Sequence, residues 1–221
     1  MATLHARPRP TGAPKVLVPL LTALLLATAP ATAQRVVSTR VTANAFGTAV
    51  IGLIENDAPH GVDVVRLSVT LLDASGEPLA RQTGVPDVRV LAPGERSAFT
   101  VQSMGTSRPD AAAAAMVDLT VRPAEAPPEA LEVRGVRAEP SRAGTRVTGT
   151  VANVGEAPLA FIKVSATALG PNDAILATSV YYENLRTLAP GASMPFTVLV
   201  PGLLEAPTDW LVRAYDGRSA P

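Results

Sequence analysis

The side chains that could carry out catalysis are few in this sequence. Outside the first 33 residues the only histidine is His60, in the segment Asp57–Gly61, and the chain contains no cysteine. Zinc clusters built from His and Cys therefore cannot form. A Ser-His-Asp triad would need His60, which the Pro and Gly beside it place in an exposed loop. No G-x-S-x-G, phosphate-binding loop or H-E-x-x-H occurs, so we predict no enzyme activity, no catalytic residue and no cofactor.

Three carboxylates offer the only candidate ligands for a metal ion. Asp57 and Asp63 flank the His60 loop, and Asp73 ends an apolar segment. Calcium binds carboxylate and carbonyl oxygens, so a site at one end of the fold is conceivable. The D-x-D-x-D spacing of strong calcium loops is absent, however. The favoured interpretation is that these are ordinary turn carboxylates, and we predict no metal site.

Aromatic side chains supply a candidate binding surface. Tyr181, Tyr182 and Trp210 are three of the six aromatic residues of the C-terminal half. Exposed together, they could stack on a sugar ring or anchor a protein partner. Alternatively, Trp210 packs in a core and one Tyr hydroxyl closes a loop. Exposure of Tyr182 and Trp210 would favour sugar binding, whereas burial of both would favour a protein-interaction module.

The first 33 residues have the three parts of a secretory signal peptide. Arg7, Arg9 and Lys15 precede an apolar run over 16–27, and Ala31-Thr32-Ala33 has the A-x-A form of a cleavage site. The apolar run is shorter than the roughly 20 residues that a membrane span needs. We therefore predict cleavage before Gln34, and a mature chain that does not span a membrane.

The mature chain is mildly acidic. Removing residues 1–33 takes away three of 19 basic residues and none of 19 acidic ones, which leaves a net charge of −3 (16 − 19). This balance argues against nucleic-acid binding, which needs a basic face. Many secreted β-sandwiches of eukaryotes carry disulfides, so an exported chain without cysteine is more typical of bacteria. The predicted location is therefore the periplasm or the extracellular medium of a bacterium.

The sequence contains an internal repeat. Gly52–Asn56 recurs as Gly149–Asn153, 97 residues later (149 − 52), and the match continues without a gap to Phe99–Val101 and Phe196–Val198. Such a length suits two copies of a small β-sandwich. We predict domains at 34–122 and 131–221, joined by a Pro-rich linker at 123–130.

Period-2 alternation and turn residues fill both copies. Over 64–73, Val65, Leu67, Val69 and Leu71 are predicted to face one way, with polar residues between them. Gly52 inside a strand suggests a bulge or a close backbone neighbour. Pro93-Gly94 and Pro190-Gly191 are typical of type II turns. The predicted fold is all-β, with two tandem antiparallel immunoglobulin-like β-sandwiches.

The pattern G-x-V-x-N, D-x-x-G, L-x-P-G and F-x-V resembles the FxLYD-type immunoglobulin-like domain of bacterial exported proteins. Leu71 and Asp73 retain two positions of the motif that names the family. The resemblance covers most of each copy and implies a sandwich without implying an activity. It is carried in the first copy by Gly52, Asn56, Asp73, Gly76, Leu91, Pro93, Gly94 and Phe99, and in the second by Gly149, Val151, Asn153, Leu188, Pro190, Gly191 and Phe196.

Two functions of different class follow from these features. The first is a non-catalytic envelope protein whose tandem modules act as a spacer or bind another envelope protein, since sandwiches present edge strands. The second is a carbohydrate-binding module that uses Tyr181, Tyr182 or Trp210 on a polysaccharide. The sequence favours the first.

Overall fold

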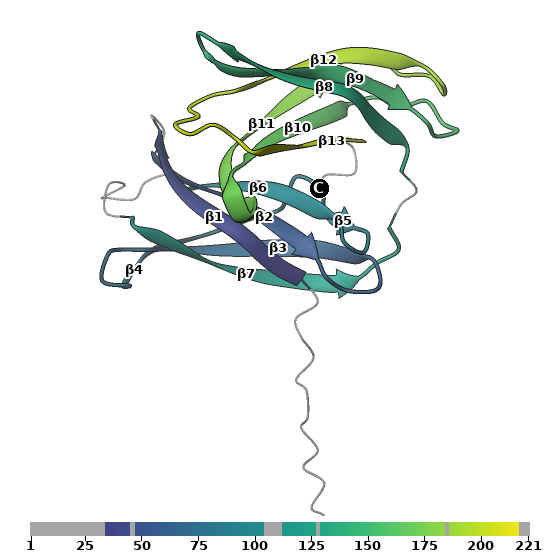
Figure 1. The fold of residues 1–221 in the computed structure, drawn as a ribbon. Helices are drawn as coiled ribbons and strands as arrows, with labels where there is room; N and C mark the ends of the chain where they lie inside the picture. The colour runs from purple at the N-terminus through teal and green to yellow at the C-terminus, as the bar shows by residue number, and fades with distance from the viewer. Residues whose placement is uncertain (1–33, 45–46, 104–111, 127–128, 184–185, 217–221) are drawn as a thin grey trace, which may run out of the picture. The chain divides into compact units, whose positions relative to one another are not determined.

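Antiparallel strands make up almost all of the regular secondary structure of the described residues (Figure 1). It is a computed structural model that describes residues 34–44, 47–103, 112–126, 129–183 and 186–216. The predicted signal peptide, 1–33, lies outside these ranges. Within them the helical content is a single 3-10 turn, Pro171–Asp173. The prediction of an all-β fold with tandem sandwiches is confirmed.

Two sheets form the N-terminal sandwich. One has the order β1-β2-β6, and the other has β3 between β7 on one side and β4 and β5 on the other. All pairings are antiparallel. The strands are β1 (Gln34–Asn44), β2 (Gly47–Asn56), β3 (Val62–Leu72), β4 (Pro78–Gly84), β5 (Val90–Leu91), β6 (Arg96–Ser103) and β7 (Ala114–Pro123).

The C-terminal sandwich repeats this plan. Its sheets have the orders β12-β9-β8 and β11-β10-β13. An isolated bridge between Leu159 and Leu188 takes the place of the pair Val62–Leu91 in the first copy. The strands are β8 (Leu131–Ser141), β9 (Gly144–Asn153), β10 (Ile162–Leu169), β11 (Ile175–Glu183), β12 (Ser193–Val200) and β13 (Asp209–Asp216).

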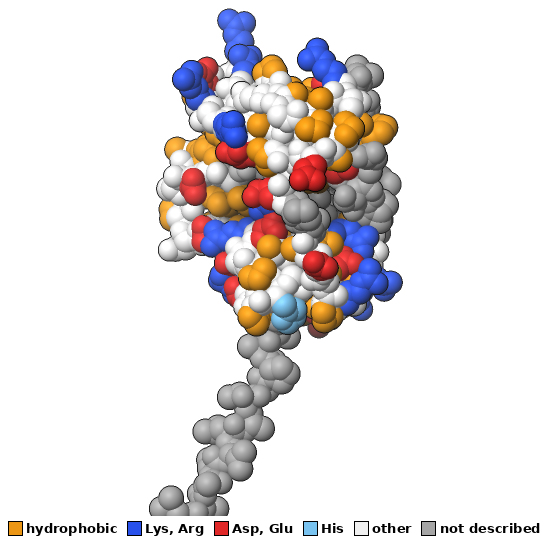
Figure 2. Space-filling model, turned by 90° about the vertical axis from the view of Figure 1, so that its right-hand side faces the viewer, with side chains coloured by type: hydrophobic (Ala, Val, Ile, Leu, Met, Phe, Trp, Pro, Cys, Tyr) orange, Lys and Arg blue, Asp and Glu red, His pale blue; other side chains and the backbone are white. Residues whose placement is uncertain are grey.

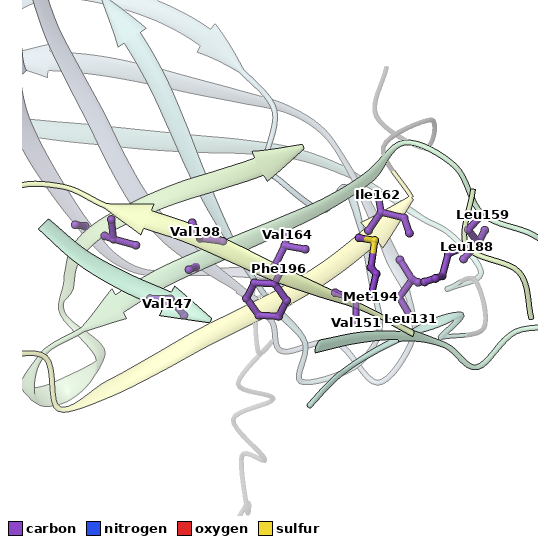
Figure 3. Close-up of a cluster of buried hydrophobic side chains, with 13 residues drawn as sticks. Leu131, Val147, Val151, Leu159, Ile162, Val164, Leu188, Met194, Phe196 and Val198 are labelled. Carbon is purple, nitrogen blue, oxygen red and sulfur yellow. The ribbon is translucent and has the colours of Figure 1, made fainter. Parts of the chain in front are cut away.

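Each sandwich has its own hydrophobic core between its two sheets. The first core contains Leu67 and Phe99, and the second contains Val164 and Phe196. Figure 3 shows side chains of β9 and β12 in one layer with Ile162 and Val164 of β10. Burying these apolar side chains supplies the main driving force for each fold.

One detail of the predicted alternation in β3 is wrong. Leu67, Val69 and Leu71 are buried as predicted, but Val65 is 37% exposed and Val64 points inward in its place. The pairing of β3 with β7 shifts between Val64 and Arg66. This bulge inserts one residue and so reverses the facing of the strand before it.

A buried asparagine ties three segments together at the end of β2. The Asn56 amide nitrogen donates to the carbonyls of His60 (2.9 Å) and Leu91 (3.0 Å), and its Oδ1 accepts from Ala58 N–H (3.0 Å). The Asn56 carbonyl accepts from the N–H of Gly94 in the Pro-Gly turn, at 2.8 Å. We call this arrangement the Asn clamp. It fixes the loop after β2 and the turn before β6.

The second copy has the same clamp. Asn153 donates to Ala157 (2.8 Å) and Leu188 (2.9 Å), accepts from Gly155 N–H (3.0 Å), and its carbonyl accepts from Gly191 N–H (2.9 Å). Gly94 and Gly191 have φ of 73° and 74°, as the third position of a type II turn requires. The repeated G-x-x-x-N and L-x-P-G patterns therefore encode one structural device.

The glycine within the repeated strand gives room to an aromatic ring. A Cβ on Gly52 would overlap the ring of Phe99, which is fully buried, and Gly149 has the same relation to Phe196. The pairs Gly52–Phe99 and Gly149–Phe196 lie opposite each other across their strands. The sequence suggested a bulge or a close backbone neighbour at Gly52, and this is wrong: the close neighbour is the side chain of Phe99, and β2 pairs with β6 there without a register shift.

Apolar residues are also buried outside both cores. Leu53 and Ala98, on the face of β1-β2-β6 away from the first core, are 0% and 3% exposed. Residues 32–221 form one compact unit, in which β11 packs against β1 and β2. Ser38 Oγ of β1 donates to the Asp173 carbonyl (2.8 Å) and accepts from Ile175 N–H (3.0 Å). We call this contact between the β1-β2-β6 and β11-β10-β13 sheets the junction.

Replacing the clamp asparagine should destabilise the protein in either copy. Asn56→Ala and Asn153→Ala each remove three hydrogen bonds and leave buried carbonyls unpaired, which we expect to lower the free energy of unfolding by about 3 kcal/mol. Urea unfolding followed by circular dichroism measures the loss. The exposed Thr100→Ala in β6 is the control, and a clamp variant no less stable than this control would contradict the assignment.

Candidate functional site

A lysine lies between two tyrosines on the β11-β10-β13 sheet. Lys163 of β10 is paired with Tyr182 of β11 and with Tyr215 of β13, so the three side chains share one face. The Lys163 ammonium is 5.4 Å from the Tyr182 ring centroid and 5.9 Å from that of Tyr215. Both distances suit cation–π attraction. We call these residues the aromatic–lysine row.

The row offers one open ring and one cation. Tyr182 is 60% exposed, whereas Lys163 and Tyr215 are half-buried. Burial, with smaller contributions from Asp87 and Tyr182, raises the pKa of Tyr215 well above its usual range, so this phenol stays protonated. No described carboxylate lies within ion-pair distance of Lys163. An exposed ring beside an ammonium can stack on a sugar and bind an anionic group. Figure 2 shows one outer face of the molecule, on which orange apolar side chains and charged side chains are interspersed.

The structure separates the three aromatic residues of the candidate surface. Tyr181 and Trp210 are on the opposite face of the sheet from Tyr182 and pack against the second core. The Tyr181 hydroxyl donates to Glu183 Oε2 (3.1 Å), and burial with this hydrogen bond raises the pKa of Tyr181. Tyr182 is thus the surface residue of the three, because neighbours along a strand face opposite ways.

Sequence reasoning did not find Lys163 or Tyr215. Both become neighbours of Tyr182 only through the pairing of β10 with two other strands. The one available signal was that Lys163 is the single lysine of the predicted mature chain.

The other candidate residues are engaged in structural contacts or lie at the surface. His60 is exposed. Asp57 accepts from Arg35 (3.2 Å), and the buried Asp63 binds Arg89 (2.9 Å) and Arg122 (2.7 Å). Asp73 Oδ1 accepts from the Ser75 hydroxyl, Ser75 N–H and Glu77 N–H within a turn, and these bonds lower its pKa. Among the described residues no three His, Asp or Glu side chains group as metal ligands.

Comparisons with known proteins give a weak structural similarity. No protein-family model and no curated protein sequence matches this chain. The crystal structure of red sea bream transglutaminase is similar over 83% of this chain and 30% of that chain, with 15% identity and a TM-score of 0.23. The described part of this chain contains no helix with the length and apolar character that crossing a membrane requires.

Alanine substitutions should distinguish the aromatic residue that packs on the core from the one at the surface by their effect on stability. Trp210→Ala removes a ring packed on the second core, and we expect unfolding to become easier by about 2 kcal/mol. Tyr182→Ala removes an exposed ring and should cost less than about 1 kcal/mol. Thermal and urea unfolding measure both. Equal losses of unfolding free energy at the two positions would contradict a core-facing Trp210 and a solvent-facing Tyr182.

Proposed function

We propose that this is an exported bacterial envelope protein without catalytic activity, whose tandem immunoglobulin-like sandwiches act as a structural spacer or bind another envelope protein. The observation that supports this most is the junction. It buries apolar side chains such as Leu53 between sheets of different sandwiches. A hydrophobic contact of this kind restrains domain motion, as a spacer of fixed geometry needs.

The edges of one sheet support docking through side chains. In the sheet β12-β9-β8, the edge strand β12 carries Pro195, and the edge strand β8 has a bulge between Arg134 and Arg137. Proline and bulges are the usual means of blocking unwanted strand pairing. A partner at this sheet would therefore contact its faces and loops.

The family resemblance is part of this proposal. We propose that both sandwiches are FxLYD-type modules. The Asn clamp supports it, because Asn56 and Asn153 are motif positions and both bind the L-x-P-G segment.

Export can be tested by expressing the full chain in a Gram-negative host. We expect the protein to be recovered outside the cytoplasm with Gln34 as its first residue, as measured by fractionation and intact mass. A version without residues 1–33 is the matched control and should remain in the cytoplasm. Recovery of the full chain in the cytoplasm with residues 1–33 attached would contradict export.

Partner binding can be tested with immobilised 34–221 and a cross-linked envelope extract. We expect saturable retention of a defined envelope protein, unchanged by Tyr182→Ala. Turnover of any envelope component by the purified chain would contradict the non-catalytic assignment.

The aromatic–lysine row supports a second candidate, a carbohydrate-binding module. In this case an acidic polysaccharide would be retained in affinity electrophoresis and lost with Tyr182→Ala. Met116→Ala, at a position 51% exposed in the N-terminal sandwich, is the control. Retention unaffected by Tyr182→Ala would argue against this candidate.

A further inference from the structure

One carboxyl group in the junction has an oxygen atom that lacks a hydrogen-bond partner. Asp87 lies between β4 and β5, and its N–H donates to the Ala98 carbonyl on the edge strand β6, at 2.8 Å. This bond places Asp87 beside the buried Ala98. The Asp87 Oδ2 atom is inaccessible to solvent and unpaired. An ionised carboxylate in such a position is costly.

The charged groups near Asp87 do not neutralise it. Lys163 of β10 is the cation that acts on it, yet no ion pair within 4.0 Å joins them. The ammonium of Lys163 is instead held between the rings of Tyr182 and Tyr215. Tyr215 of β13 also interacts with Asp87.

The remaining charges close to this region have partners of their own. Arg89, two residues after Asp87, binds Asp63. Arg213 of β13 binds Glu95, and Arg96 binds Asp173 (3.1 Å). Each of these three arginines already forms an ion pair with another carboxylate, so none of them neutralises a negative charge on Asp87.

We propose that Asp87 is a pH-dependent lock on the junction: the closed junction holds this carboxyl group in its neutral form, and loss of the proton favours separation of the two sheets. This goes beyond a spacer role, because it makes the restraint between the sandwiches conditional on pH.

The direction of the pH effect follows from proton binding. Burial raises the pKa of Asp87 from 3.8 to about 7 in the closed state, and Lys163 only partly opposes the rise. In the open state the Asp87 carboxyl is exposed to water, and its pKa returns towards 3.8. Between these values the closed state binds one more proton, so its stability falls as pH rises. The stability that the neutral Asp87 carboxyl gives to the closed junction is fully present below pH 3.8 and is lost by about pH 7.

The absence of cysteine permits a direct measurement of junction opening. Ala98→Cys places a thiol in the junction, and its rate of labelling by a maleimide reports opening. Ala166→Cys, in the second core, reports global unfolding, and Ser75→Cys, in an exposed turn, corrects for thiol ionisation. All three are made in otherwise intact 34–221 and labelled between about pH 5 and about pH 8.

The labelling rate of the Ala98→Cys variant, divided by that of the Ser75→Cys variant, should rise about tenfold per pH unit and level off near neutrality. When Asp87→Asn is added to both variants, the ratio should be flat. Lys163→Met should move the plateau to higher pH, because removing the cation makes ionisation of Asp87 harder.

Three results would overturn the proposal. The first is an unchanged pH profile when Asp87→Asn is present. The second is a parallel rise in the labelling rate of the Ala166→Cys variant, which would mean that the whole protein unfolds. The third is a plateau that moves to lower pH with Lys163→Met.

Discussion

Each sandwich depends on one buried asparagine amide. A loop leaving a strand and a turn entering another both expose backbone carbonyls, and inside a fold these must be paired. The amides of Asn56 and Asn153 pair two such carbonyls each while their oxygens accept from the loop. No apolar side chain of similar size could do this. The Pro-Gly turn, the loop and the adjoining strand are therefore held by the same residue in both copies.

The ring-over-glycine pairs show how packing and hydrogen bonding cooperate. Phe99 and Phe196 follow the Pro-Gly turns of their clamps in the chain and cover a glycine in the neighbouring strand. Because the glycine has no side chain, the ring can approach the backbone and fill the space that a Cβ would occupy. The strand pairing that brings the ring over the glycine also brings the Pro-Gly turn to the asparagine.

The two copies share this internal plan but differ in what their outer faces do. Leu53 and Ala98 of the first copy are buried in the junction, which is not a property of the repeat. The β11-β10-β13 sheet of the second copy meets these residues. Its strand β11 carries the exposed Tyr182 near one end, and at the other end the Ile175 N–H donates to Ser38 Oγ. A duplicated fold has thus acquired one face for contact within the chain and one ring open to solvent. The unpaired Asp87 oxygen lies where the first of these faces meets the aromatic–lysine row.

The sequence by itself determined what is local. Alternation predicted most strands, Pro-Gly predicted the turns, and the repeat predicted two equivalent units. It could not place the bulge in β3, and so put Val65 inward instead of Val64, because a bulge depends on the partner strand. It grouped Tyr181, Tyr182 and Trp210, since side-chain facing across three strands needs the register. Only the tertiary structure brought Lys163 between two tyrosines and buried the Oδ2 atom of Asp87 in the junction. Both arrangements depend on contacts between residues far apart in the chain, and these contacts cannot be predicted from the local sequence pattern.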